Sequence, residues 1–206
     1  MSPATRSSAR DASHTRCKRA SMSPSEFAEA KLVRLFLAAM LASCALVAWS
    51  APDEFVAAVV YVIDGDTMVV EDGDGNEAHV RIVSIDAPEK GRRGLPGQPY
   101  SDRSRKYLYS LVGRKDVRLI SPGRDDYGRI LARVWLGDMD VGLAQVCAGY
   151  AWVFDKYIHE LPIAEQRTYQ ACETQARQER RGLWRGSRPT PPWQWRYTRR
   201  DAETGR

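Results

Sequence analysis

The chain has 206 residues and a formal net charge of +5, a length that suits one domain with additional segments. Residues 1–50 hold 7 basic and 3 acidic side chains, and residues 177–206 hold 9 basic and 3 acidic ones. Residues 51–176, in contrast, hold 15 basic and 20 acidic side chains. The central body therefore carries a net charge of −5, which argues against a uniformly basic nucleic-acid-binding protein.

The chain opens with a segment that is expected to be a disordered leader followed by an export signal. Residues 1–30 are rich in Ser, Ala and Arg without periodicity, and Met22 is an alternative start. Lys31 and Arg34 then precede the apolar run 35–49, which at 15 residues is short for a membrane span. This order of basic and apolar segments is typical of a secretory signal peptide.

Two processing sites compete at the end of this run. Small residues at Ala48 and Ser50 predict cleavage before Ala51. The segment 41–44, Leu-Ala-Ser-Cys, resembles a lipoprotein box, with Cys44 as a possible lipid anchor. We therefore expect a secreted or periplasmic protein; the alternatives are a membrane-attached lipoprotein, an uncleaved signal anchor and a cytosolic form.

Cysteine positions become informative once the leader is set aside. Cys17 and Cys44 fall within it, which leaves Cys147 and Cys172 in the mature chain. A pair of cysteines in an exported protein predicts a disulfide, and two buried free thiols are the alternative.

The body of the chain is predicted to form short strands with helices between and after them. Apolar alternation predicts five strands, at 55–63, 67–71, 77–85, 116–120 and 129–136. Helical spacing predicts three helices, at 101–112, 141–148 and 161–180. Five strands with a helix between the third and the fourth predict an α+β, mainly β fold, a five-stranded OB-fold barrel flanked by three helices.

The domain boundaries follow from this pattern. We expect a leader over 1–50, a folded domain over 51–186 and a Pro/Trp/Arg-rich tail over 187–206, with 189–196 irregular. Two tryptophans of the tail, Trp193 and Trp195, are expected either to pack against the body or to stack on bases.

The most informative stretch is residues 81–89, Arg-Ile-Val-Ser-Ile-Asp-Ala-Pro-Glu. Its pattern predicts an alternating strand that Pro88 ends, because proline cannot donate a ladder hydrogen bond. Asp86 and Glu89 are therefore presented at the strand end. Upstream lies 64–67, Asp-Gly-Asp-Thr, and downstream lies 125–129, Asp-Asp-Tyr-Gly-Arg.

These three segments together resemble the staphylococcal nuclease family, over about Phe55 to Trp184. The resemblance implies that Asp66 and Asp86 hold one calcium ion, with the carbonyl of the next residue as a further ligand. That residue is Ala87 here, whereas the family has threonine, so the carbonyl is kept and the hydroxyl is lost. The family's catalytic residues correspond to Arg81, Glu89 and Arg129.

The resemblance also implies the activity, a calcium-dependent hydrolysis of DNA and/or RNA that leaves 3′-phosphate ends. Glu89 would act as the general base, and Arg81 and Arg129 would contact the phosphate. Tyr127 would contact a nucleotide, and roles in the stretch 150–157 are not assigned. We expect a monomer without a stable protein partner.

The residue types suit this chemistry. A hard cation held by carboxylates neutralises charge on phosphoryl oxygens and orients water. The planar guanidinium of arginine donates two hydrogen bonds to phosphate oxygens and stays charged. In a regular strand, however, Arg81 and Asp86 would face opposite sides, so their convergence requires the strand to bend or to end.

Simpler interpretations remain beside these assignments. Asp64, Asp125 and Asp126 can be turn residues, and Arg81 alone can be a surface strand arginine. A non-catalytic binding module on the same barrel and an envelope structural protein anchored by 35–49 are the rival functions.

Overall fold

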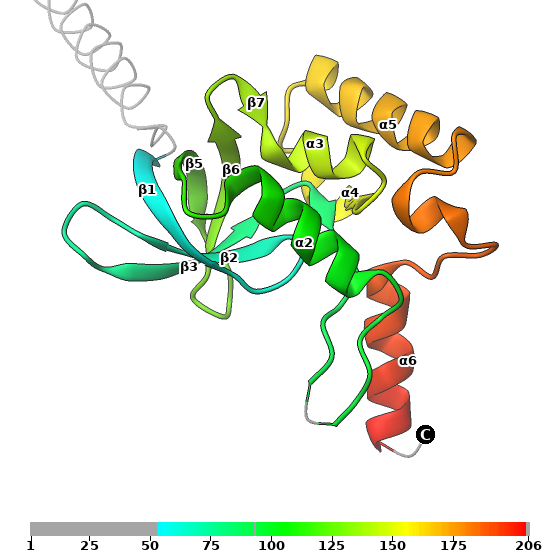
Figure 1. Cartoon of the computed structure of the whole chain (residues 1–206). Coiled ribbons are helices and arrows are strands. Elements are labelled where there is room, and N and C mark those ends of the chain that lie inside the picture. Colours follow the sequence, from blue (N-terminus) through cyan, green and yellow to red (C-terminus); the bar gives the residue numbers. More distant parts are fainter. Residues whose placement is uncertain (1–52, 93, 205–206) are drawn as a thin grey trace, which may run out of the picture. The chain divides into compact units, whose positions relative to one another are not determined.

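The structure, a computed structural model, describes residues 53–92 and 94–204, and it describes their side chains as far as residue 200. Its main sheet contains β1 (Asp53–Val62), β2 (Thr67–Glu71), β3 (Glu77–Ile82), β5 (Asp116–Arg124) and β6 (Ile130–Leu136), in the order β3-β2-β1-β5-β6 (Figure 1). Parallel pairing of β3 with β6 closes this sheet into a five-stranded barrel, which confirms the predicted OB-fold class. The short β7 (Met139–Asp140) extends the sheet beyond β6.

The barrel interior is filled by alternate residues of its strands. In β1, Ala57, Val59 and Val62 are buried, whereas Val56 and Val60 are exposed. Residues 56–60 follow the period of two that places successive side chains on opposite faces of a sheet, and an irregularity between Val59 and Tyr61 shifts this period before Val62. The same core contains buried side chains from the other strands, Met68, Val70, Val80, Ile82, Val117, Leu119, Ala132 and Val134.

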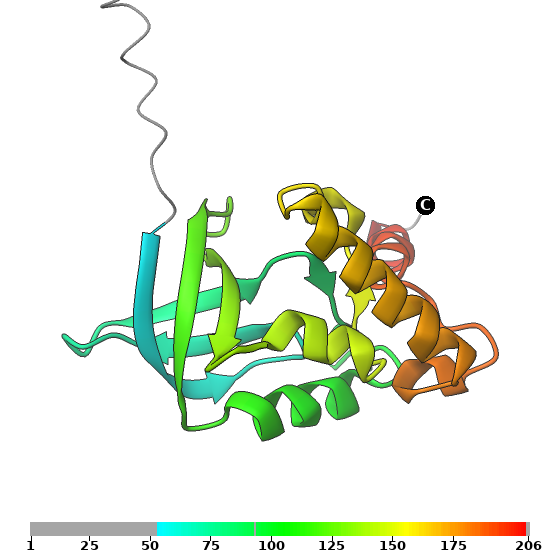
Figure 2. The ribbon, with the colours of Figure 1, turned by 90° about the horizontal axis from the view of Figure 1, so that it is seen from above.

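All three predicted helices are present. They are α2 (Ser101–Val112), α3 (Val141–Cys147) and α5 (Ile163–Gln178). Leu108 and Val112 of α2 belong to the barrel core. Figure 2 shows the strands gathered on one side of the described part and the helices on the other. The described residues also include α4 (Asp155–Ile158), a short 3-10 helix (Gly182–Arg185) and α6 (Pro192–Thr204).

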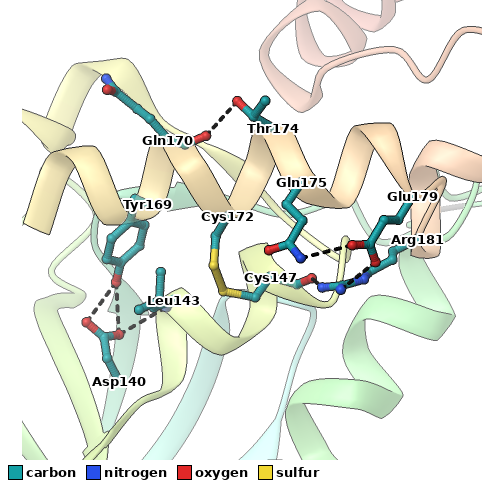
Figure 3. Close-up of a disulfide and its surroundings, with 10 residues drawn as sticks. All are labelled: Asp140, Leu143, Cys147, Tyr169, Gln170, Cys172, Thr174, Gln175, Glu179 and Arg181. Atoms are coloured by element: carbon teal, nitrogen blue, oxygen red, sulfur yellow. Dashed lines mark hydrogen bonds and ion pairs between the residues drawn. A yellow bond between two sulfur atoms is a disulfide. The ribbon is translucent and has the colours of Figure 1, made fainter.

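Cys147 and Cys172 form the predicted disulfide, with their Cα atoms 4.7 Å apart (Figure 3). The bond joins the end of α3 to α5, and Arg181 donates a hydrogen bond to the carbonyl of Cys147 at 2.9 Å. Tyr169 of α5 donates to Asp140, which also caps the N-terminus of α3. A cross-link of this span typically stabilises a domain by about 2–4 kcal/mol.

The predicted third strand was too long. β3 ends at Ile82, and Ile85–Asp86 is a separate strand, β4, that pairs antiparallel with β8 (Trp152–Val153). The break lies at Ser84, whose φ of 65° is in the left-handed region that a strand cannot accommodate. The chain therefore changes direction between Arg81 and Asp86.

The prediction of an irregular tail over 189–196 was wrong, because residues 192–204 form the helix α6. Pro192 occupies the first helical position, where proline's missing N–H and fixed φ are tolerated. The ring of Trp193 stacks on Phe154, with the centroids 5.9 Å apart. This tryptophan therefore packs against the body.

The predictions for the leader and for Cys44 lie outside the described residues. Within the described ranges, no helix is both long and apolar enough to cross a membrane.

Candidate active site

The site begins at the tight connection 64–66 between β1 and β2. A Cβ atom on Gly65 would overlap the hydroxyl oxygen of Ser104, so the close approach of α2 requires glycine here. The amide of Asp66 donates to the carboxylate of Asp64 at 3.2 Å, and this bond orders the turn. Asp66 itself is buried, with 3% of its surface exposed.

Asp66 connects the two segments of the predicted cation site. One of its carboxylate oxygens accepts a hydrogen bond from the hydroxyl of Thr67 at 2.9 Å and also pairs with Arg81. Its other oxygen accepts a hydrogen bond from the amide of Ala87 at 2.6 Å. Asp66 and Ala87 are therefore in direct contact, although they lie 21 positions apart in the chain.

Arg81 and Asp86 converge, as the predicted site requires. The guanidinium of Arg81 donates to Asp86 at 2.9 Å while its other terminal nitrogen pairs with Asp66. The turn at Ser84 makes this possible, because it reverses the side to which β4 presents its residues. Arg81 is 9% exposed and Asp86 is 0% exposed, so the ion pairs form in a water-poor interior.

The pKa values show how densely the buried charge is packed. Burial raises the pKa of Asp64 to about 8, and the neighbouring charge of Asp66 adds to the effect. Burial also raises the pKa of Asp86, despite its hydrogen bonds from Arg196. For Asp66, burial is outweighed by the charge of Arg81 and the amide of Ala87, which lower its pKa. Three carboxyl groups, those of Asp64, Asp66 and Asp86, thus lie close together in a largely buried region, where Arg81 and Arg196 offset the charges of Asp66 and Asp86.

Glu89 lies after β4 and forms an ion pair that the sequence did not suggest. Arg196 of α6 donates to Glu89 at 2.6 Å. The same guanidinium donates to both oxygens of Asp86, at 3.1 and 2.8 Å. Asp86 therefore has a second positively charged partner besides Arg81, and this partner, Arg196, also binds Glu89.

Arg129 is held by an acidic neighbour at the start of β6. Its Nε and one terminal nitrogen bind the Asp125 carboxylate at 2.8 and 2.7 Å. Asp125 also accepts the amides of Tyr127 and Arg129, which confirms it as a turn residue. Tyr127 is 85% exposed, and the guanidinium of Arg129 lies 5.6 Å from its ring centre.

These groups surround a cleft with a volume of about 570 Å³. Among the described residues, seven basic side chains line it, Arg81, Arg92, Arg129, Lys156, Arg196, Arg199 and Arg200. Three acidic side chains, Asp64, Asp66 and Glu89, and four aromatic ones, Tyr127, Phe154, Tyr157 and Trp195, also line it. Asp86 does not line the cleft itself but binds two of its lining arginines, Arg81 and Arg196. The cleft is basic although the body that carries it is acidic.

Of the predicted site residues, the structure places Asp66, Arg81, Ala87, Glu89, Arg129 and Tyr127 around this one cleft. Sequence reasoning missed the contributions of α4 and α6. The stretch 150–157 carried a signal, since it contains aromatic residues, but its alignment was ambiguous. For α6, the spacing of Trp195, Arg196, Arg199 and Arg200 was a helical signal that the surrounding prolines obscured.

The donor chemistry fits a hard divalent cation. Asp66 and Asp86 provide anionic oxygens of the kind that hard cations prefer. Within the described residues, however, no group of three or more His, Cys, Asp and Glu side chains could hold a metal ion. The oxygens of Asp66 and Asp86 are instead occupied by the guanidinium groups of Arg81 and Arg196 and by the Ala87 amide.

Comparison with known proteins gives a consistent result. Residues 79–186 match the family described as staphylococcal nuclease homologue. A protein of Escherichia coli named uncharacterized endonuclease is 41% identical over 142 residues, which cover 68% of this chain and 83% of the relative. A protein of Haemophilus influenzae with the same name is 36% identical over 138 residues, which cover 67% of this chain and 71% of the relative. Protein ParB of Escherichia coli is 34% identical over 147 residues, which cover 67% of this chain and 77% of that protein.

The barrel and its cleft define an OB-fold protein with a basic site built around buried carboxylates. The match over 79–186 and the identity to these relatives show that the chain belongs to the staphylococcal nuclease family, as the sequence motifs predicted.

Proposed function

We propose that this protein is a calcium-dependent nuclease that hydrolyses phosphodiester bonds of DNA and/or RNA. The observation that carries the proposal is that Arg81, which binds both Asp66 and Asp86, lines one basic cleft together with Glu89. The relatives from Escherichia coli and Haemophilus influenzae are named endonucleases, which supports the same activity here.

The proposed roles follow from the chemistry of each side chain. Glu89 lines the cleft and accepts the proton of the attacking water as a general base. Arg81 and Arg129 donate hydrogen bonds to the phosphate oxygens, and these bonds strengthen as negative charge builds up in the transition state. Cleavage at the 5′ oxygen leaves a 3′-phosphate and a 5′-hydroxyl.

Asp66 and Asp86, with the carbonyl of Ala87, are the proposed ligands of calcium. When bound, the ion would neutralise charge on the phosphoryl oxygens and help to orient water. Arg196 now donates to both oxygens of Asp86, so a calcium ion at this carboxylate would have to share it with that guanidinium or displace it. Arg196 is therefore a competitor for the cation site.

Cleavage should require calcium, and magnesium should substitute poorly. Two carboxylates, a carbonyl and water make a loose shell of high coordination number, which the strict octahedron of magnesium disfavours. The measurement is the cleavage rate of labelled DNA and RNA in calcium, in magnesium and in chelator. Full activity in chelator would end the metal hypothesis, whereas equal activity in magnesium would end only the selectivity.

Replacing Arg196 by glutamine should tighten calcium binding. The change removes a charged competitor for Asp86 worth about 1.5 kcal/mol or more, so the dissociation constant should fall by about tenfold. Calorimetric titration of the nucleic-acid-free protein measures this directly. Arg167→Gln, at an exposed position of α5 outside the cleft lining, is the matched control. An unchanged or weaker affinity in Arg196→Gln alone would show that the guanidinium does not compete.

A further inference from the structure

We propose that α6 is a substrate-binding wall of the cleft, in which Arg199 and Arg200 bind backbone phosphates of a single nucleic-acid strand beside the scissile bond. This inference rests on the nuclease function proposed above, since it concerns the same cleft. It adds a binding element that lies outside the matched family region, residues 79–186.

The helix presents one face to the cleft. Residues three or four positions apart lie on the same side of a helix. This spacing relates Arg199 to Trp195 and to Arg196, and Arg200 to Arg196, so the four side chains share one side of α6. All four line the cleft together with Asp66 and Glu89. Figure 1 shows α6 beside the loop that leads from β4 to α2, and its side chains line the cleft.

Three contacts fix α6 in this position. Arg196 binds Asp86 and Glu89, and the ring of Trp193 stacks on Phe154. Just before the helix, the side-chain amide of Gln98 donates to the carbonyl of Thr190 at 2.6 Å. Gln98 is itself buried, and its side-chain oxygen accepts the amide of Glu89. The segment leading into α6 is therefore tied to the same corner that carries the proposed base.

The charge distribution gives this arrangement a function. Residues 51–176 carry 15 basic and 20 acidic side chains, so a polyanion approaching the body alone meets a net charge of −5. The described part of α6 contributes three of the seven basic side chains that line the cleft. Nucleic-acid affinity depends mainly on neutralising phosphates, so the arginines of the helix add to the attraction of the four basic side chains that the body places in the cleft.

Arg196 cannot supply this attraction by itself, because Asp86 and Glu89 already neutralise it. Arg199 and Arg200 lie about one helical turn further along, a rise of about 5 Å. Both side chains line the cleft, where a phosphate of a bound strand can approach them.

The aromatic lining favours a single strand over a duplex. Tyr127, Phe154, Tyr157 and Trp195 line the cleft, and rings of this kind serve as stacking platforms for unpaired bases. Bases in a duplex are already stacked on one another and cannot use them. The combination of rings with a row of arginines is the pattern of a channel that follows the backbone of one strand.

The test is the double variant Arg199→Gln/Arg200→Gln in the full chain, with Arg167→Gln as the control for a lost positive charge outside the cleft. Binding of a labelled single-stranded oligonucleotide is measured by fluorescence anisotropy in chelator, which prevents cleavage, over a range of salt concentrations. The double variant should raise the dissociation constant by about tenfold or more. It should also flatten the slope of log affinity against log salt by about 1.4, at about 0.7 for each phosphate that is no longer neutralised. Under cleavage conditions its KM should rise by a similar factor, with a much smaller change in kcat.

An affinity and salt slope equal to those of Arg167→Gln would overturn the inference. A loss confined to duplex DNA would overturn the assignment to a single strand. The two proposals can fail separately. If binding depends on Arg199 and Arg200 but the wild type cleaves nothing, the nuclease function alone is rejected. Cleavage with the same KM in the double variant and in the control would reject the role of α6 alone.

Discussion

Replacing Glu89 by glutamine should lower kcat by about 10²- to 10⁴-fold, the loss expected for a general base. Glutamine has nearly the same shape and cannot accept the proton of the attacking water. Its side-chain carbonyl can still accept the hydrogen bond that Arg196 now donates to Glu89. The fold and the position of α6 should therefore be kept, and affinity for the nucleic acid should change little.

Glu71→Gln is the matched control for this change, because Glu71 is an exposed carboxylate at the end of β2, outside the cleft lining. Single-turnover cleavage measures the chemical step, and circular dichroism checks the fold. If the Glu89→Gln variant turns over about as fast as Glu71→Gln, Glu89 is not the general base.

Arg81→Lys should lower kcat by about 10²-fold or more, because a lysine ammonium cannot reproduce the planar fork of arginine. The structure adds a second consequence. Arg81 now pairs with Asp66 and Asp86 at once, in a buried position. A lysine that satisfies only one of these carboxylates loses a charged hydrogen bond, so the free energy of unfolding should fall by about 1.5–3 kcal/mol.

Arg118→Lys on β5 is a suitable comparison, since Arg118 forms an exposed ion pair with Glu54 at 3.2 Å. An exposed pair of this kind contributes about 1 kcal/mol at most. Urea unfolding and steady-state kinetics on both variants separate the two effects. If Arg81→Lys turns over like the wild type, a role for Arg81 at the phosphate is excluded, whatever its effect on stability.

The sequence predicted the barrel, and it singled out residues that the structure places around one cleft, because both are recorded in local patterns. The apolar runs of β1 and β2, together with the corner Asp86-Ala87-Pro88-Glu89, mark where strands end and where carboxylates are presented. The sequence also indicated that Arg81 and Asp86 would face opposite sides of a regular strand, so that a bend was needed between them. It could not locate the turn at Ser84, because a left-handed serine carries no distinctive signal.

The contribution of α6 could not be predicted for a different reason. Its position depends on contacts between residues far apart in the chain, such as Arg196 with Asp86, which are separated by 110 positions. Local sequence shows a Pro-rich segment with two tryptophans, which is equally compatible with an irregular tail. Only the fold shows that Arg196, Arg199 and Arg200 of α6 line the same cleft as Asp66 and Glu89.

The most direct test of the proposed activity is the cleavage of an end-labelled strand in calcium by wild-type and Glu89→Gln protein purified in the same way, with analysis of the new ends. We expect rapid cleavage by the wild type, products with 3′-phosphate and 5′-hydroxyl ends, and a loss of about 10²-fold or more in the variant. Equal cleavage by both proteins, or the absence of cleavage by the wild type, would contradict a nuclease that acts through this site.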